Sequence, residues 1–353
     1  MYTILAESEE TIGPLYNLIW ESIVPYLTDI VTLYVAPSGL FSTISFAAFK
    51  NPDGSYIAGK YTIHNLLSTR YIAILKERKE KTSGKKDVVL FGGADFGLSA
   101  SMLEASDNVD TAEESRSSFV NGTVDEFFNR RGQGFDIMAG SLAEVQVIEK
   151  ITSAAKWKTS LFTDTKATET RLKSYSGNSS KVLHISTHGF YFSPPDKDSL
   201  LDVRRVQGNS FSKAVEPMMR SGLLLSGANN IWTGRTPADI SNDGVLTAYE
   251  IANLDFSNTE LVVLSACDTG LGDIDYSEGI YGLQRAFRLA GVRSMIISLW
   301  KVPDEETTAL MTAFYIAWTS GLPMKQAFEK AQMDLRKRYP EEPYKWGGFV
   351  LIE

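Results

Sequence analysis

Two short apolar runs, each followed by polar residues and glycine, constrain this 353-residue chain most strongly. Residues 261–264 lead to Cys267, the chain's only cysteine, and residues 182–186 lead to His188 and Gly189. Such runs are typical of fully buried strands in a parallel sheet, in which the loops at the carboxyl ends of the strands carry the functional site. If the two strands are neighbours, the thiol and the imidazole meet at one edge of the sheet.

This pairing suits nucleophilic catalysis. A free thiol, with a pKa of ~8.5, is mostly protonated at neutral pH, whereas the thiolate is the species that attacks. An imidazole nearby, with a reference pKa of ~6.5, can take that proton and later return it to a leaving amine. Because Gly189 has no Cβ, its N–H and that of Cys267 are candidates for stabilising an oxyanion.

Each of these residues also has a simpler interpretation. A lone cysteine is often a small buried hydrophobe, and His188 can be a hydrogen-bonded loop residue. His184 and His188 lie four residues apart, but on a strand they would not converge on one ion, and further ligands are few. We therefore expect no metal and no cofactor, and interpret His184 as a strand residue that supports the site.

Six motifs, in this order and spacing, resemble the CHAT family of caspase-like cysteine peptidases, relatives of separases within the caspase and gingipain superfamily. The motifs are His184-Ile-Ser-Thr-His-Gly189, Leu264-Ser-Ala-Cys-Asp-Thr-Gly270, Glu278-Gly-Ile-Tyr-Gly-Leu283, Ala290-Gly-Val-Arg-Ser294, Ser298-Leu-Trp-Lys-Val-Pro-Asp304 and Trp346-Gly-Gly-Phe-Val-Leu-Ile352. The resemblance implies that His188 is the general base, that Cys267 is the nucleophile, and that the amides of Gly189 and Cys267 form the oxyanion hole.

The resemblance also implies a substrate-binding surface. Ser298, Leu299 and Trp300 are candidates for strand-like contacts with the substrate main chain. Asp304 or Asp268 is a candidate partner for a basic side chain before the scissile bond. For Asp304 a helix cap is an alternative, because acidic residues favour that end of a helix.

Length and pattern predict an α/β fold with parallel-dominated sheets flanked by helices and two halves, and the resemblance implies that this fold is of the caspase-like type. Residues 1–150 lack a cysteine and a histidine-glycine pair, which predicts an inactive, pseudo-caspase scaffold half; residues 151–353 are the predicted active half. Polar residues 99–133 predict a mobile surface insertion, in which Arg130 and Arg131 form a candidate self-processing site.

Two further patterns concern the segments around the site. Ser141 and Glu144 have the spacing of a capping box, which predicts that a helix begins there. Residues 190–221 form a long segment just beyond the histidine, and we interpret it as a gate for substrate or a site for a regulator.

Composition limits the partners. A formal net charge of -8 disfavours a large nucleic-acid surface, and no apolar run reaches the ~18 residues of a membrane span. One cysteine and the absence of a visible secretory signal predict a cytoplasmic protein. The expected partners are a protein substrate and an activating sensor or repeat-containing protein. The alternative function is a catalytically silent interaction module on the same fold.

Overall fold

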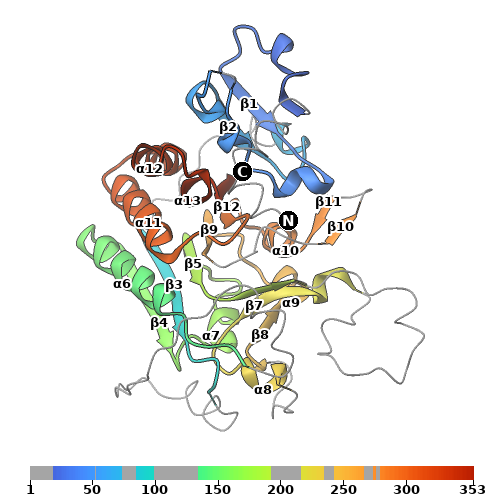
Figure 1. Ribbon diagram of the computed structural model, residues 1–353. Coiled ribbons are helices and arrows are strands. Elements are labelled where there is room, and N and C mark those ends of the chain that lie inside the picture. The colour runs from blue at the N-terminus through green and yellow to red at the C-terminus, as the bar shows by residue number, and fades with distance from the viewer. Residues whose placement is uncertain are drawn as a thin grey trace.

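One eight-stranded sheet organises the molecule (Figure 1). The structure is a computed structural model that describes residues 19–51, 53–73, 85–98, 134–191, 216–233, 242–265, 273–275 and 279–353. The strand order is β1-β2-β13-β12-β9-β5-β3-β4, and every neighbouring pair is parallel except β12 and β13. The predicted α/β class with a parallel-dominated sheet is confirmed. The strands are β1 (Thr32–Val35), β2 (Thr62–Asn65), β3 (Asp87–Ala94), β4 (Lys158–Asp164), β5 (Val182–Ser186), β9 (Leu261–Ser265), β12 (Ser294–Ser298) and β13 (Phe349–Ile352).

The three central strands are buried at every position because helices cover both faces of the sheet. Each is rich in leucine, isoleucine, valine or methionine, so neither face alternates with polar residues. Each also ends in a serine, which is Ser186 in β5, Ser265 in β9 and Ser298 in β12. The polar ends of these strands therefore meet at one edge of an apolar sheet.

Helices lie on both sides of the sheet (Figure 1). On one side α6 (Ala139–Ala154) packs against α11 (Asp304–Thr319), which packs against α12 (Met324–Arg338). The other side carries α7 (Glu169–Lys173), α9 (Ala248–Ala252) and α10 (Leu283–Leu289). The short helices α8 (Asn229–Trp232) and α13 (Pro343–Trp346) complete the set of described α-helices. Acidic residues occupy the first turn of α11 and basic residues the last turn of α12, which complements the helix dipoles.

Two smaller antiparallel sheets flank the main one. Strands β6 (Gly189–Tyr191), β7 (Ser221–Leu224) and β8 (Val245–Thr247) form one, and β10 (Asp273–Asp275) and β11 (Gly279–Tyr281) form the other. The apolar spacing of residues 278–290 is typical of a single helix, but the helix α10 begins only at Leu283. Residues 279–281 form strand β11 instead of helix because they pair with β10.

The buried side chains form two clusters. The larger spans the central sheet and its helices, and the smaller contains Trp20, Phe46, Phe49, Ile57 and Tyr61 beside β1 and β2, at the top of Figure 1. Strand β3, which precedes residue 150, pairs with β4 and β5, which follow it, and residue 150 itself lies within α6. The division into halves 1–150 and 151–353 stays a prediction. The predicted insertion at 99–133, with Arg130 and Arg131, lies outside the described residues, as does most of the predicted gate.

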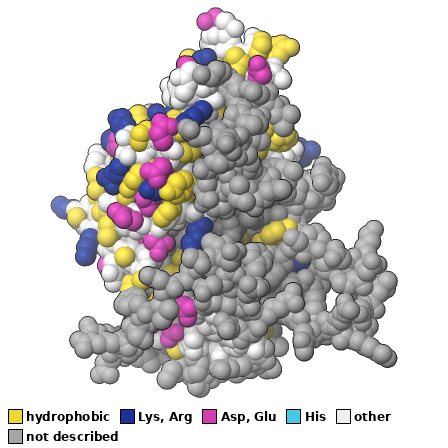
Figure 2. All heavy atoms as spheres, in the orientation of Figure 1, with side chains coloured by type: hydrophobic (Ala, Val, Ile, Leu, Met, Phe, Trp, Pro, Cys, Tyr) yellow, Lys and Arg dark blue, Asp and Glu magenta, His cyan; other side chains and the backbone are white. Residues whose placement is uncertain are grey.

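The face in Figure 2 carries mixed charge where it is described. Basic, acidic and apolar side chains alternate over the side of the molecule that holds α6, α11 and α12, without separating into patches of one sign. No α-helix within the described ranges combines the length and the apolar character that crossing a membrane requires.

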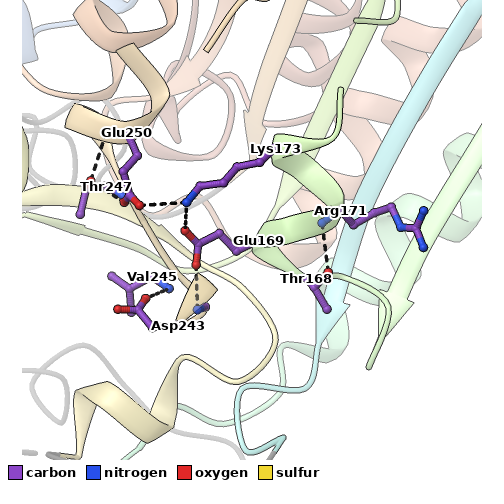
Figure 3. Close-up of polar contacts among 9 residues, drawn as sticks. Thr168, Glu169, Arg171, Lys173, Asp243, Val245, Thr247 and Glu250 are labelled. Carbon is purple, nitrogen blue, oxygen red and sulfur yellow. Dashed lines mark hydrogen bonds and ion pairs between the residues drawn. The ribbon is translucent and has the colours of Figure 1, made fainter. Parts of the chain in front are cut away.

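A partly buried ion-pair cluster, in which Glu169 is the buried member, joins α7 to the turn before β8 (Figure 3). Lys173 Nζ lies 2.6 Å from Glu169 Oε1 and 2.9 Å from Glu250 Oε1, and Gly244 N donates to Glu169 Oε2 at 2.9 Å. Burial raises the pKa of Glu169 to about 8, against the opposite effect of Lys173. The cluster therefore holds β8, and through it β7 and β6, against α7.

Replacing Lys173 with methionine is expected to lower the free energy of unfolding by about 3 kcal/mol at pH 9, because Glu169 is then buried without its cation. The folded-state pKa of Glu169 is raised above its ordinary value. The stability that this group contributes is therefore fully present below the unfolded-state pKa and is lost as pH rises through about 8. The loss in the variant should be smaller at pH 6, as measured by urea unfolding. Equal losses at both pH values would contradict this account, and Lys337→Met, at an exposed lysine, is the control.

Candidate active site

The two strands that lead to the predicted dyad are neighbours. Strands β5 and β9 pair in parallel, with Ser186 directly opposite Ser265. His188 lies two residues beyond the first serine and Cys267 two residues beyond the second. The prediction that these strands adjoin is confirmed. Cys267 and Asp268 lie outside the described residues, so the contact between sulfur and imidazole stays a prediction.

His188 is half-buried between two aromatic rings. The ring centroids of Phe96 and Phe135 each lie 5.2 Å from that of the imidazole. His188 Nε2 lies 3.4 Å from the carbonyl oxygen of Asp136, which can only accept, so this nitrogen carries the hydrogen and Nδ1 keeps a lone pair. Burial, with a smaller contribution from the nearby charge of Lys301, lowers the pKa of His188 to about 4. The imidazole is therefore neutral at pH 7 and able to accept a proton.

The amide of Gly189 is oriented by the pairing of β6 with β7. Leu224 N donates to His188 O at 2.9 Å, and Gly189 stands opposite Leu223. In an antiparallel ladder, hydrogen-bonded pairs alternate with pairs that are not hydrogen-bonded. The N–H of Gly189 is thus expected to point away from β7. This direction suits an oxyanion donor, and that role stays a prediction.

Beneath the strand ends, Glu144 of α6 collects three hydrogen bonds. Glu144 Oε2 accepts from Ser186 Oγ at 2.7 Å and from Ser265 Oγ at 2.8 Å, while Oε1 lies 3.1 Å from His184 Nε2. His184 Nδ1 in turn lies 3.2 Å from the hydroxyl of Tyr315. Both ring nitrogens of His184 are therefore engaged by protein groups, which supports its interpretation as a residue that supports the site.

The capping-box interpretation of Ser141 and Glu144 is wrong. Helix α6 begins at Ala139 after Met138, and neither side chain caps it. Instead, the Ser141 hydroxyl donates to the carbonyl of Ser186 and accepts from Gly93 N at 2.9 Å. Ser141 and Glu144 have the spacing of a capping box because residues three apart lie on the same face of a helix. That face is buried here, and both side chains form hydrogen bonds with residues of distant strands instead of with the helix end.

A small cavity of about 30 Å³ lies at the ends of the central strands. Its lining includes Ser298, Trp300 and Asp304 of the predicted substrate surface, together with Glu144 and Lys301. Such a volume holds about two water molecules. Leu299 is not in the lining, and its N–H donates to Gly348 O at 2.8 Å, so this edge of the strand is already paired.

Asp304 is the first residue of α11, and Pro303 rather than Asp304 is its N-cap. The Asp304 carboxylate rests against Gly140, where a Cβ would overlap it. Because Pro303 is the N-cap, the helix-cap interpretation of Asp304 is wrong. The side chain is exposed and lines the cavity, and its role in a substrate pocket stays a prediction.

Sequence reasoning missed several residues of the site. Phe96, Phe135 and Asp136 surround His188, and Tyr315 completes the network below it. A signal existed only for Glu144, which lies on the stripe of buried residues in α6. An acidic side chain within such a stripe needs hydrogen-bond donors from another element, because a buried unpaired charge is costly. Among the described residues, no group of three or more histidine, cysteine, aspartate or glutamate side chains has an arrangement suited to a metal ion.

Comparison with known proteins shows where this fold occurs. The model of the CHAT domain matches residues 9–353. Tetratricopeptide repeat protein 28 of Mus musculus is 31% identical over 109 residues, and that of Homo sapiens is 30% identical over 109 residues. The match covers 31% of this chain and only 4% of either relative.

Two solved structures share the architecture. The Arg-specific cysteine proteinase gingipain R aligns with 98% of this chain and 67% of its own, at a TM-score of 0.53 and 10% identity. The complex of the pro- and mature domains of RgpB from Porphyromonas gingivalis aligns with 98% and 68%, at a TM-score of 0.52 and 10% identity. The likeness establishes a caspase-like fold.

Proposed function

Because the chain belongs to the CHAT domain family, we propose that it is a cysteine endopeptidase. The observation that supports this most directly is the register of β5 and β9, in which Ser186 stands opposite Ser265. His188 and Cys267 each follow two residues later. Their loops therefore leave the same edge of the sheet from neighbouring strands.

In the proposed reaction, the Cys267 sulfur attacks the carbonyl carbon of a peptide bond while its proton passes to Nδ1 of His188. The N–H groups of Gly189 and Cys267 stabilise the oxyanion. The carbon–nitrogen bond then breaks, and the proton moves from His188 to the leaving amine. Water, deprotonated by the same imidazole, hydrolyses the thioester and frees the thiol.

For the substrate, we propose that Asp304 or Asp268 receives a basic side chain, and that Ser298, Leu299 and Trp300 lie along the substrate, with the Leu299 N–H remaining bonded to Gly348 O. The exposure of the Asp304 side chain supports its part in this proposal, because a basic side chain is too large for the cavity and would meet the carboxylate outside it. Lys301 lines the same cavity, and its positive charge would repel a basic substrate side chain that Asp304 attracts. Glu144 is a weaker candidate because its oxygens already accept three hydrogen bonds.

We also propose regulation by a repeat-containing partner. The curated relatives are described as tetratricopeptide repeat proteins, and the chain spans 4% of their length. A peptidase of this kind would stay inert until a partner bound, and the predicted gate at residues 190–221 is the candidate site for that regulator.

The test is a peptide library incubated with the purified chain and read by mass spectrometry. We expect cleavage once a repeat-containing candidate partner is added, with cuts mainly after arginine or lysine, because a carboxylate beside the scissile bond pairs with a cation and not with an acidic or apolar side chain. In Asp304→Asn, cuts after basic residues should fall about tenfold relative to other cuts. Cuts mainly after acidic or apolar residues would remove Asp304 and Asp268 from the pocket without touching the peptidase assignment.

The control for this test is Asp334→Asn, at an exposed acid of α12 on the surface. It should leave the cleavage pattern unchanged. Absence of cleavage, both alone and with added repeat-containing candidate partners, would contradict the proposed function.

A further inference from the structure

We propose that Glu144 is a positioning residue that sets the spacing between the loops of His188 and Cys267. The inference rests on the proposed function, since it concerns how that dyad is held. It assigns no contact with substrate to Glu144. It concerns instead the only described side chain that is hydrogen-bonded to the ends of both strands.

The first step is the place of the hydroxyl donors. Ser186 and Ser265 are the last residues of β5 and β9 and stand directly opposite one another. One oxygen, Glu144 Oε2, accepts a hydrogen bond from each, at 2.7 and 2.8 Å. Neighbouring strands lie ~4.8 Å apart, so a shared acceptor of this kind ties the two strand ends at a defined separation.

The second step is the support of the carboxylate itself. Its other oxygen lies 3.1 Å from His184 Nε2, and the remaining ring nitrogen of His184 lies 3.2 Å from the hydroxyl of Tyr315. Burial, with a smaller effect of Glu144, raises the pKa of Tyr315 well above its ordinary value, which keeps this hydroxyl a donor. Hydrogen bonds to a charged group are worth more than neutral ones, and here they fix the rotamer of Glu144.

The third step is the close approach of α6 to the sheet. A Cβ on Gly92 would lie 2.7 Å from Val145 Cγ1, so β3 admits the helix only because glycine stands there. The Ser141 hydroxyl also bonds Gly93 N and the carbonyl of Ser186. The helix that carries Glu144 is thereby clamped to the strand that leads to His188.

Glu144→Gln is the variant that removes this function with the least change in shape. The amide has one oxygen where the carboxylate has two, so at least one donor loses its acceptor and faces another donor. The strand ends then lose their shared acceptor, while the volume of the side chain is kept. Glu169→Gln is the matched control, because Glu169 is equally buried at 2% exposure but lies in the cluster beside α7.

The readout is the rate at which iodoacetamide alkylates the chain between pH 5 and 9. Cys267 is the only cysteine, so alkylation reports on it alone and needs no substrate. The neutral imidazole of His188 can accept the thiol proton while the sulfur attacks, so we expect the parent to be alkylated at pH 6.5 about tenfold faster than a free thiol of pKa ~8.5. In Glu144→Gln the rate at pH 6.5 should fall about tenfold, because a thiol without an aligned base reacts only through its own small thiolate fraction. The Glu169→Gln protein should stay within about twofold of the parent.

A second variant, Ser265→Ala, guards against misfolding of the first, since it removes one hydroxyl and leaves Glu144 in place. It should slow alkylation in the same direction, and combining it with Glu144→Gln should add less than the sum of the two effects. A purely structural role would lower the melting temperature without moving the pH profile of the thiol.

The outcomes separate the two proposals. A parent with enhanced low-pH alkylation and a Glu144→Gln variant that matches it would overturn the positioning role and leave the peptidase assignment standing. A parent alkylated at pH 6.5 no faster than a free thiol would overturn both.

Discussion

Cys267→Ala is expected to abolish peptide cleavage, with a fall in kcat/KM of at least about 10⁴-fold, because removing the nucleophile removes the covalent route. Its affinity for a protein partner should stay within about twofold of the parent, since one small side chain is shortened. The measurement is cleavage of a candidate partner protein, followed by gel electrophoresis, beside a pull-down of the same protein.

The same comparison decides between the two classes of function. Loss of cleavage with retained binding supports the peptidase. Binding by both proteins and cleavage by neither supports the catalytically silent interaction module. Parent protein alkylated with iodoacetamide is the matched control, because it blocks the same sulfur without a change of sequence.

Replacing His188 with alanine is expected to lower kcat/KM by about a thousandfold, because general acid–base catalysis contributes ~10²–10⁴. The Cys267 sulfur remains, so slow cleavage that rises with pH should persist as the thiol ionises without help. The rate is measured with the peptide that the library identifies. His64→Ala is the control, because His64 pairs with Glu353 at the far end of β2.

The pH profile of the parent gives a second readout of the same residue. Burial destabilises the charged imidazole and lowers the pKa of His188 to about 4. The neutral base is therefore kept as pH falls from 7 to 5.5, and kcat/KM should decline only near pH 4. A decline centred at ~6.5, the ordinary value for histidine, would contradict the environment described for the ring.

Sequence patterns predicted a helix or strand correctly where the residues of that element alone determine its structure. The apolar runs at 182–186 and 261–264 are strands β5 and β9 because central parallel strands are buried on both faces. Acids at Asp304 and after it mark the start of α11, since the helix dipole acts on its own first turn. The resemblance to the CHAT family, carried by six motifs, is confirmed over residues 9–353.

Sequence patterns failed at residues that could continue a helix but pair with another strand instead. Residues 279–281 match the helix that follows them, yet they pair with β10, and 245–247 pair with β7 before α9 begins. The insertion of β13 between β12 and β2 joins residues far apart in the chain. The periodicity of apolar residues within one strand does not indicate which distant strand it will pair with.

The chain alone predicted which residues are candidates for the chemistry, because a single cysteine and a histidine-glycine pair each end an apolar run. Only the tertiary structure decided what surrounds them. The partners of Glu144 are 40, 42 and 121 residues away in sequence, so its spacing from Ser141 suggested a helix cap instead. The aromatic rings that set the basicity of His188 likewise come from distant segments, and folding brings them together because burial of apolar surface stabilises any such contact regardless of chain separation.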